Sequence, residues 1–351
     1  MIRATQVSSF APTSVELPSC IPVTPPEIPI PSMSDAPLVT HIFTADPSAH
    51  VFAGRIYIYP SHDLPDDLPE NDLGDHYGMT DYHVLSQDHP EGPTQDHGQA
   101  LHVKDVPWAS RQMWAPDAAF RNGRYYLYFP AKDKDGIFRI GVATSAKPEG
   151  PFKAEPEPIK GSFSIDPCVF QAADGEFYMV FGGVWGGQLQ RWASGRYDPN
   201  GRERQGDEQA LSPKIAKLTP DMLQFATPPQ DVVITGAGGQ PLLARATTQR
   251  YFEGPWIHRY RDTYYLSYST GDTHLLVYAT SQSPAGPFTF RGQIMSPPVG
   301  WTTHHSILEH DGRWWLYYHD ASLSGGVSSK RCVKVQELFY EADGSIRPMQ
   351  P

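Results

Sequence analysis

The chain has 351 residues, of which 39% are hydrophobic and 12% aromatic, enough for one large core without disulfide or metal staples. Its formal net charge of −11 repels nucleic acids and anionic membrane surfaces, so neither is expected as a partner. No run of about 20 apolar residues is present to cross a membrane as a helix.

The first part of the chain, residues 1–37, is predicted to be a leader that lies loosely on the surface. Residues 1–11 lack the apolar stretch of a secretory signal, and residues 12–37 are rich in proline and serine. Cys20, Cys168 and Cys332 lack the spacing of a metal site, so we expect reduced thiols. Together these features predict a cytoplasmic protein.

Residues 38–351 are dominated by a short phrase of aromatic and aliphatic residues that occurs five times and reads as a strand. Its copies begin at Gly54, Gly123, Gly175, Thr263 and Gly312. They stand 49 to 88 residues apart (312−263 and 263−175), which fits units of about four strands. With 35 prolines and 30 glycines arguing against long helices, the pattern predicts an all-β fold, a five-bladed β-propeller.

Two segments fall outside the repeat, residues 60–110 and residues 193–250. Both are predicted to be long insertions between strands, and long insertions near a rim tend to shape a pocket. For the second segment, a mobile surface loop is an equally good interpretation.

A polar residue precedes each copy of the phrase by 6 to 10 residues, which predicts five side chains directed at a shared axis. In chain order these residues are Asp46, Asp117, Asp166, Glu253 and His304. Taken singly, each acid could be a turn or cap residue. Because a polar residue recurs at this place in all five units, a shared site is favoured over five separate turn or cap residues.

The surroundings of the acids suggest different roles. Glu253 lies between Phe252 and Trp256, and such apolar walls disfavour a carboxylate, so Glu253 is the candidate proton donor. Asp46, in a wetter site, is the candidate base, and Asp166 could tune the donor. Cleavage of a glycosidic bond needs two carboxyl groups with different pKa values, one to protonate the leaving oxygen and one to activate water or attack the sugar.

The remaining polar positions have weaker interpretations. Asp117 is expected to be structural or secondary, and His304 is either a ligand that reaches a central ion or a hydrogen-bonded core histidine. Tryptophan faces stack on sugar rings, but a propeller also buries tryptophan between blades. We therefore expect a sugar platform from one or two of the tryptophans beside these positions, which are Trp114, Trp185, Trp256 and Trp301.

Five phrases spread from about residue 40 to residue 340 give the chain a resemblance to glycoside hydrolase family 43. They are Ala45-Asp46-Pro47-Ser48, Trp114-Ala115-Pro116-Asp117, Ile165-Asp166-Pro167, Glu253-Gly254-Pro255 and His304-His305-Ser306. The resemblance implies a five-bladed propeller, inversion at the anomeric centre, and a base, a pKa modulator and an acid. Those roles would fall on Asp46, Asp166 and Glu253.

The resemblance also implies a calcium ion in the central channel, reached by His304, and an arginine that touches the sugar, matched by Arg331. The candidate substrate-binding residues are then Trp114, Trp185, Trp256, Arg331 and His305.

The predicted function is that of an inverting exo-glycosidase that releases terminal β-D-xylosyl, and possibly α-L-arabinofuranosyl, groups from xylo-oligosaccharides or arabinoxylan fragments. An endo-arabinanase, or another five-bladed glycosidase acting on galactosides or anhydro-sugars, is the alternative among enzymes. A carbohydrate-binding propeller without catalysis would need the aromatic platform but not the acids. A propeller used as an interaction scaffold would have neither a pocket nor sugar binding.

Overall fold

The structure, a computed structural model, describes residues 36–65, 68–301 and 303–351. The predicted leader lies almost wholly outside the described residues, as does Cys20, so the predicted boundary at residue 37 stays a prediction. Cys168 and Cys332 are buried free thiols. No helix in the described part of the chain is long and apolar enough to cross a membrane.

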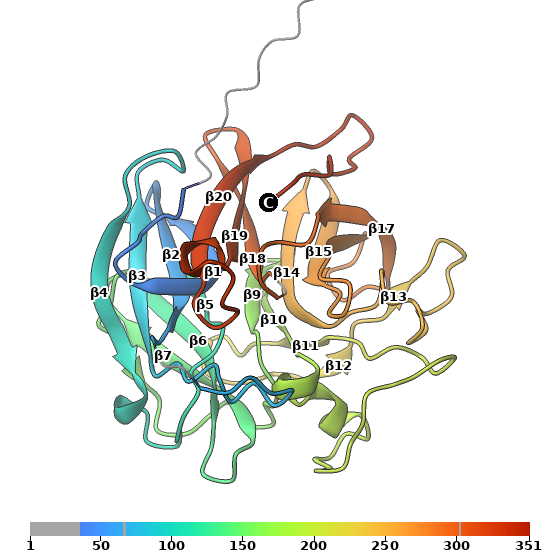
Figure 1. Cartoon of the computed structure of the whole chain (residues 1–351), viewed down its shortest axis with the longest axis horizontal. Coiled ribbons are helices and arrows are strands. Elements are labelled where there is room, and N and C mark those ends of the chain that lie inside the picture. The colour runs from blue at the N-terminus through green and yellow to red at the C-terminus, as the bar shows by residue number, and fades with distance from the viewer. Residues whose placement is uncertain (1–35, 66–67, 302) are drawn as a thin grey trace, which may run out of the picture. The chain divides into compact units, whose positions relative to one another are not determined.

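The described residues form five sheets arranged as the blades of a propeller, which confirms the predicted fold (Figure 1). Blade 1 contains β1 (Phe43–Phe52), β2 (Arg55–Asp63), β3 (Asp81–Gln87) and β4 (Gln95–His102). A short 3₁₀ helix, η1 (Val103–Asp105), follows it. Blade 2 contains β5 (Asp117–Arg121), β6 (Arg124–Lys132), β7 (Phe138–Ser145) and β8 (Lys153–Ala154).

Blade 3 contains β9 (Cys168–Gln171), β10 (Phe177–Phe181), β11 (Lys214–Lys217) and β12 (Gln230–Asp231). Two 3₁₀ helices, η2 (Trp185–Gly187) and η3 (Leu189–Trp192), lie between β10 and β11. Blade 4 contains β14 (Glu253–Tyr260), β15 (Thr263–Ser269), β16 (Leu276–Ser281) and β17 (Phe288–Met295), with β13 (Ile234–Thr235) parallel to β17 at its edge. Blade 5 contains β18 (His305–His310), β19 (Arg313–Asp320) and β20 (Cys332–Leu338), with η4 (Ser322–Ser324).

The repeated phrase is the second strand of every blade, namely β2, β6, β10, β15 and β19. These strands are covered on both faces by neighbouring blades, so they read as continuous apolar runs; in β6, Leu127, Tyr128 and Phe129 are all fully buried. The hairpin between β5 and β6 is a tight two-residue turn. Asn122 and Gly123 both have positive φ (53° and 76°), as a two-residue turn between right-twisted strands requires.

The two ends of the described chain close the ring. Strand β1, in blue, lies beside β18, β19 and β20, in red (Figure 1). The backbone N–H of Leu38 donates to the carbonyl of Val333 (2.8 Å), and that of Thr44 donates to the carbonyl of Arg331 (2.9 Å). Blade 5 is therefore tied to blade 1 although, among the described residues, it has three strands rather than the expected four.

The two segments predicted as insertions are only partly loops. Residues 60–110 contain the end of β2 and all of β3 and β4, and residues 193–250 contain β11, β12 and β13. Their strands carry many polar residues, for example His83 and Asp96. Because these residues interrupt the alternation of apolar and polar positions, the sequence pattern does not indicate these strands.

Candidate active site

A cavity of about 480 Å³ lies where the innermost strands of the five blades begin. Asp46 belongs to β1, Asp166 stands two residues before β9, and Glu253 is the first residue of β14. All three line this cavity, so the structure brings together three of the four acids that precede the repeated phrase.

Asp46 is a buried carboxylate surrounded by polar side chains, and its backbone N–H donates to Nδ1 of His319 (2.9 Å). Its oxygens accept hydrogen bonds from Ser61 and from Nη1 of Arg331 (3.1 Å), and Nδ1 of His319 and of His304 lie 3.4 and 3.8 Å from its Oδ1. Burial alone would raise its pKa, but the positive charge of Arg331, then the two histidines and the Ser61 hydroxyl, lower it to about 2. Asp46 is therefore ionised at neutral pH and able to accept a proton.

Asp166 has the same backbone conformation but the opposite proton affinity. Its φ is 57° and that of Asp46 is 50°, and each residue precedes a proline. Such conformations are uncommon before proline and concentrate at functional sites. Burial, followed by the negative charges of Glu253 and Asp46, raises the pKa of Asp166 well above its usual range, although the Gly254 N–H donates to its Oδ2 (2.9 Å).

Glu253 is placed by an irregularity at the start of β14. It pairs with Ser269 on β15, and the register then shifts before Trp256 pairs with Ser267. Gly254 has φ of 64°, and a Cβ there would lie 3.3 Å from the imidazole of His304, so the glycine permits this close approach. Glu253 is only partly buried, in line with contact with a bound molecule.

Arg331 stands directly before β20 and lines the cavity. Its Nε and Nη2 donate to the two carboxylate oxygens of Asp63 (2.8 and 2.7 Å), and its guanidinium lies over the ring of Tyr77 (4.9 Å). Burial lowers its pKa, but Asp46 and Asp63 together raise it above the usual value. The guanidinium is thus a fixed positive charge beside the candidate base.

Three tryptophans line the cavity: Trp114, Trp185 and Trp301. The indole N–H of Trp114 donates to the carbonyl of Tyr77 (2.9 Å), and that of Trp185 donates to Oε2 of Glu203 (2.8 Å). Trp185 also packs edge-on against Phe252, another lining residue. The segments around residues 60–110 and 193–250 therefore contribute to the site, the first by lining it and the second through Glu203.

Two candidate substrate-binding residues do not line the cavity. Trp256 is buried between blades, where its indole N–H donates to the carbonyl of Ile307 (3.0 Å). His305 is fully buried, and its Nε2 is 2.6 Å from the Ser267 hydroxyl; burial lowers its pKa well below the usual range. Successive strand side chains face opposite sides, so of His304 and His305 only the first reaches the cavity. These two assignments are corrected accordingly.

Asp117 likewise lies outside the cavity. It is buried, accepts hydrogen bonds from Ser48 and the backbone N–H of Val169, and lies 2.7 Å from Nε2 of His50. These contacts tie blades 1, 2 and 3 together, which agrees with a structural role.

The predicted calcium site finds limited support in the side chains present. Calcium takes six to eight oxygen ligands, whereas His304 contributes one imidazole to the cavity. Among the described residues, the one group of three or more metal-ligating side chains at ligand spacing is His62, Asp81 and His83, which does not include His304. A calcium ion at His304 would have to be held largely by water.

Pattern reasoning did not single out several lining or supporting residues, including Asp63, Tyr77 and His319. Asp63 ends the second strand of blade 1 and His319 is the second-last residue of the second strand of blade 5, so a polar residue in the last two positions of such a strand is the signal that could have found them.

Comparisons with known proteins agree with this geometry. Residues 94–346 match the sequence profile described as glycosyl hydrolases family 43. The chain is 56% identical over 330 residues to xylosidase/arabinosidase 43A of Humicola insolens, covering 90% of this chain and 99% of that protein.

Solved structures give the same result. A family 43 β-xylosidase/α-arabinofuranosidase from a compost microbial metagenome, in complex with xylotriose and in a calcium-free form, has a TM-score of 0.88 and 58% identity, covering 90% and 97% of the two chains. The family 43 subfamily 1 enzyme of Xanthomonas citri complexed with xylotriose has a TM-score of 0.86 and 55% identity, covering 90% and 93%. The chain therefore belongs to glycoside hydrolase family 43 and is a glycoside hydrolase.

Proposed function

We propose that this chain is an inverting exo-glycosidase that releases terminal β-D-xylosyl groups, and also α-L-arabinofuranosyl groups, from xylo-oligosaccharides or arabinoxylan fragments. The observation that carries the proposal is one cavity in which three carboxyl groups have different environments. Asp46 is held ionised beside Arg331, whereas Asp166 stands against Glu253 and binds its proton more tightly.

In the proposed reaction, Asp46 removes a proton from a water molecule that attacks the anomeric carbon, and Glu253 protonates the departing glycosidic oxygen from the other side of the sugar. Inversion needs a separation of roughly 6.5–9.5 Å between these carboxyl groups, which leaves room for the water. Asp166 acts on Glu253 because the two carboxyl groups oppose each other's ionisation, and it accepts a hydrogen bond from the backbone N–H of Gly254, the residue next to Glu253.

The limited size of the cavity and the loops around it support exo action. Its walls come from the loop that contains Glu70, Gly74 and Tyr77, from Gly300 and Trp301, and from the segment that ends at Arg331. A volume near 480 Å³ falls within the range of small-ligand pockets. An endo-arabinanase needs a groove that lets a polymer pass across the face.

The substrate class is supported by the relatives. The Humicola insolens and Bacteroides ovatus proteins, 56% and 51% identical, are both described as xylosidase/arabinosidase, and the two structures described above contain xylotriose. A binding propeller without catalysis has no need of three carboxyl groups in one cavity, so the cavity argues against that alternative.

We also propose that a calcium ion binds near His304 through water and stabilises the centre of the propeller; no step of the hydrolysis is assigned to it. One relative is described in a calcium-free form, which supports the relevance of the ion. Elemental analysis of the purified chain should show calcium that His304→Ala lacks. Equal calcium in both would exclude His304 as its anchor.

The deciding experiment for the enzymatic proposal is hydrolysis of 4-nitrophenyl pentosides and xylo-oligosaccharides, with the anomer of the first product read by ¹H NMR. Release of α-xylose from a β-xyloside, one unit at a time, is expected. β-Xylose as the first product would contradict inversion, and internal cleavage products would favour the endo alternative.

A further inference from the structure

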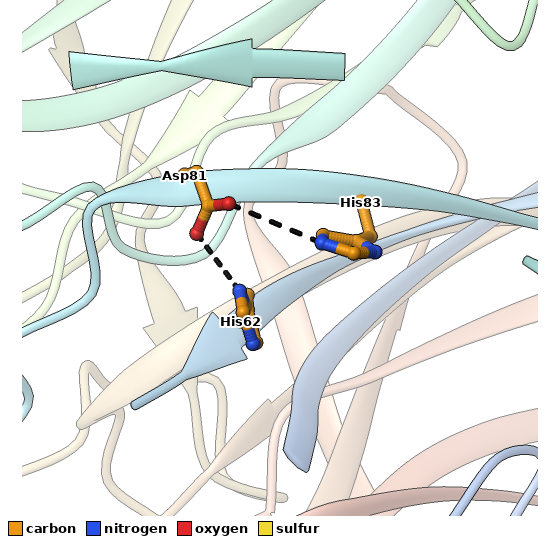
Figure 2. Close-up of side chains that lie close together, drawn as sticks. All are labelled: His62, Asp81 and His83. Atoms are coloured by element: carbon orange, nitrogen blue, oxygen red, sulfur yellow. Dashed lines mark hydrogen bonds and ion pairs between the residues drawn. The ribbon is translucent and has the colours of Figure 1, made fainter. Parts of the chain in front are cut away.

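We propose that His62, Asp81 and His83, on blade 1, form a binding site for a divalent transition-metal ion such as Zn²⁺. Figure 2 shows the three side chains directed toward one another from two neighbouring strands. Nδ1 of His62 is 2.8 Å from Oδ1 of Asp81, and Nε2 of His83 is 3.9 Å from Oδ2 of the same carboxylate. One ligand atom from each residue lies within 4.8 Å of the other two.

The sheet itself builds this arrangement. Ser61 on β2 pairs with Tyr82 on β3, so His62 lies opposite Asp81 in the antiparallel ladder. Asp81 and His83 are two residues apart on β3 and therefore project from the same face. The three ligands are fixed by backbone pairing and not by a loop, which favours a precise site.

A further carboxylate orients one of the imidazoles. Nδ1 of His83 lies 3.1 Å from Oδ1 of Asp96, and Asp96 also accepts a hydrogen bond from the backbone N–H of Gly98 (2.7 Å) and contacts Nε2 of His41 (2.8 Å). A proton on Nδ1 of His83 leaves the lone pair of Nε2 directed at Asp81. A carboxylate behind a ligating histidine is the usual support of a zinc site.

The donor set points to a particular class of ion. Two imidazole nitrogens and one carboxylate oxygen suit Zn²⁺ and neighbouring first-row metals, whereas Ca²⁺ and Mg²⁺ prefer oxygen alone. Tetrahedral binding at 2.0–2.2 Å separates ligand atoms by about 3.4 Å. The 2.8 Å between Nδ1 of His62 and Oδ1 of Asp81 is shorter than this value and would lengthen toward it when an ion enters.

The site is largely buried but still reaches solvent, and it is distinct from the catalytic cavity. The side chains of His62, Asp81 and His83 are 17%, 10% and 15% exposed, so a small ion from solvent can reach them. None of the three lines the cavity. Asp63, the neighbour of His62, instead holds Arg331.

The test is isothermal titration calorimetry of the metal-stripped full-length protein with ZnCl₂ at neutral pH. The wild type should bind one more equivalent of zinc than the double variant His62→Asn/His83→Asn. Asp96→Asn should weaken this binding by about 10–100-fold, as expected when the carboxylate behind a ligating histidine is lost. His97→Asn is the matched control, because it removes an imidazole from β4 of the same blade that contacts Ser86 and not the trio.

Equal zinc stoichiometry and affinity in the wild type and the double variant would overturn the proposal. Circular dichroism establishes that each variant is folded. If the double variant fails to fold, zinc K-edge X-ray absorption of the loaded wild type decides the matter. Scattering from two imidazoles with Zn–N near 2.0–2.1 Å is expected, and a spectrum without imidazole scattering would exclude the site.

Discussion

Asp46 and Asp166 occupy equivalent positions in two blades, yet their chemistry differs. Both precede a proline, both have φ near 50–57°, and both line the same cavity. Asp46 faces Arg331 and two histidines, which lower its pKa to about 2, while Asp166 faces Glu253, which together with burial raises its pKa. The comparison shows that the repeat sets the position of each carboxyl group. The pKa of each group, and so its protonation state, is set by side chains from neighbouring blades.

The largest effect should come from Asp46→Asn. An amide cannot take the proton of the attacking water, so kcat on an aryl xyloside should fall at least about 10³-fold. Asp262→Asn, which changes an exposed acid paired with Arg259, is the control and should leave kcat unaltered. Substantial turnover by a folded Asp46→Asn protein would show that another group is the base.

Glu253→Gln should separate the acid from the base. Substrates with poor leaving groups need protonation and should lose about 10²–10⁴-fold in kcat, whereas an activated aryl xyloside should lose much less. The measurement is a leaving-group series for both variants. An equal loss for good and poor leaving groups would contradict the assignment of Glu253 as acid.

The two aspartates should also differ in their effect on stability. The lowered pKa of Asp46 corresponds to about 2 kcal/mol of stabilisation at neutral pH, which is lost as pH falls from about 4 to about 2. Asp46→Asn should therefore lower the free energy of unfolding at pH 7, and the deficit should shrink in acid.

Asp166→Asn should have the opposite sign, because it removes a carboxyl whose ionisation is opposed by burial and by Glu253. A carboxyl group whose pKa is higher in the folded state than in the unfolded state lowers the stability of the fold once the pH exceeds its pKa in the unfolded state. Asp166→Asn removes this cost, so the variant should be as stable as the wild type or more stable at pH 7. Urea unfolding at pH 7 and in acid measures both variants. Destabilisation of similar size in both would remove the distinction.

The smallest effect should distinguish the two kinds of tryptophan. Trp185→Phe loses the hydrogen bond that fixes the indole against Glu203. If this loss weakens substrate binding by about 1 kcal/mol, KM should rise about fivefold with little change in kcat. Trp256→Phe should instead lower the unfolding midpoint without altering KM, because its indole bonds to Ile307 away from the cavity. A changed KM in Trp256→Phe would show that Trp256 contributes to substrate binding.

The amino-acid sequence by itself determined the blade number, the strand that carries each phrase and four of the five polar positions that line the cavity, because strand periodicity and tight turns are local properties. It also indicated the three acids of the cavity. Only the tertiary structure decided which of two adjacent histidines reaches the cavity, that Trp256 packs between blades, and that Asp63 and Tyr77 hold Arg331. Those outcomes depend on register and on charges from strands hundreds of residues apart, and burial and Coulomb interactions act through space, not along the chain.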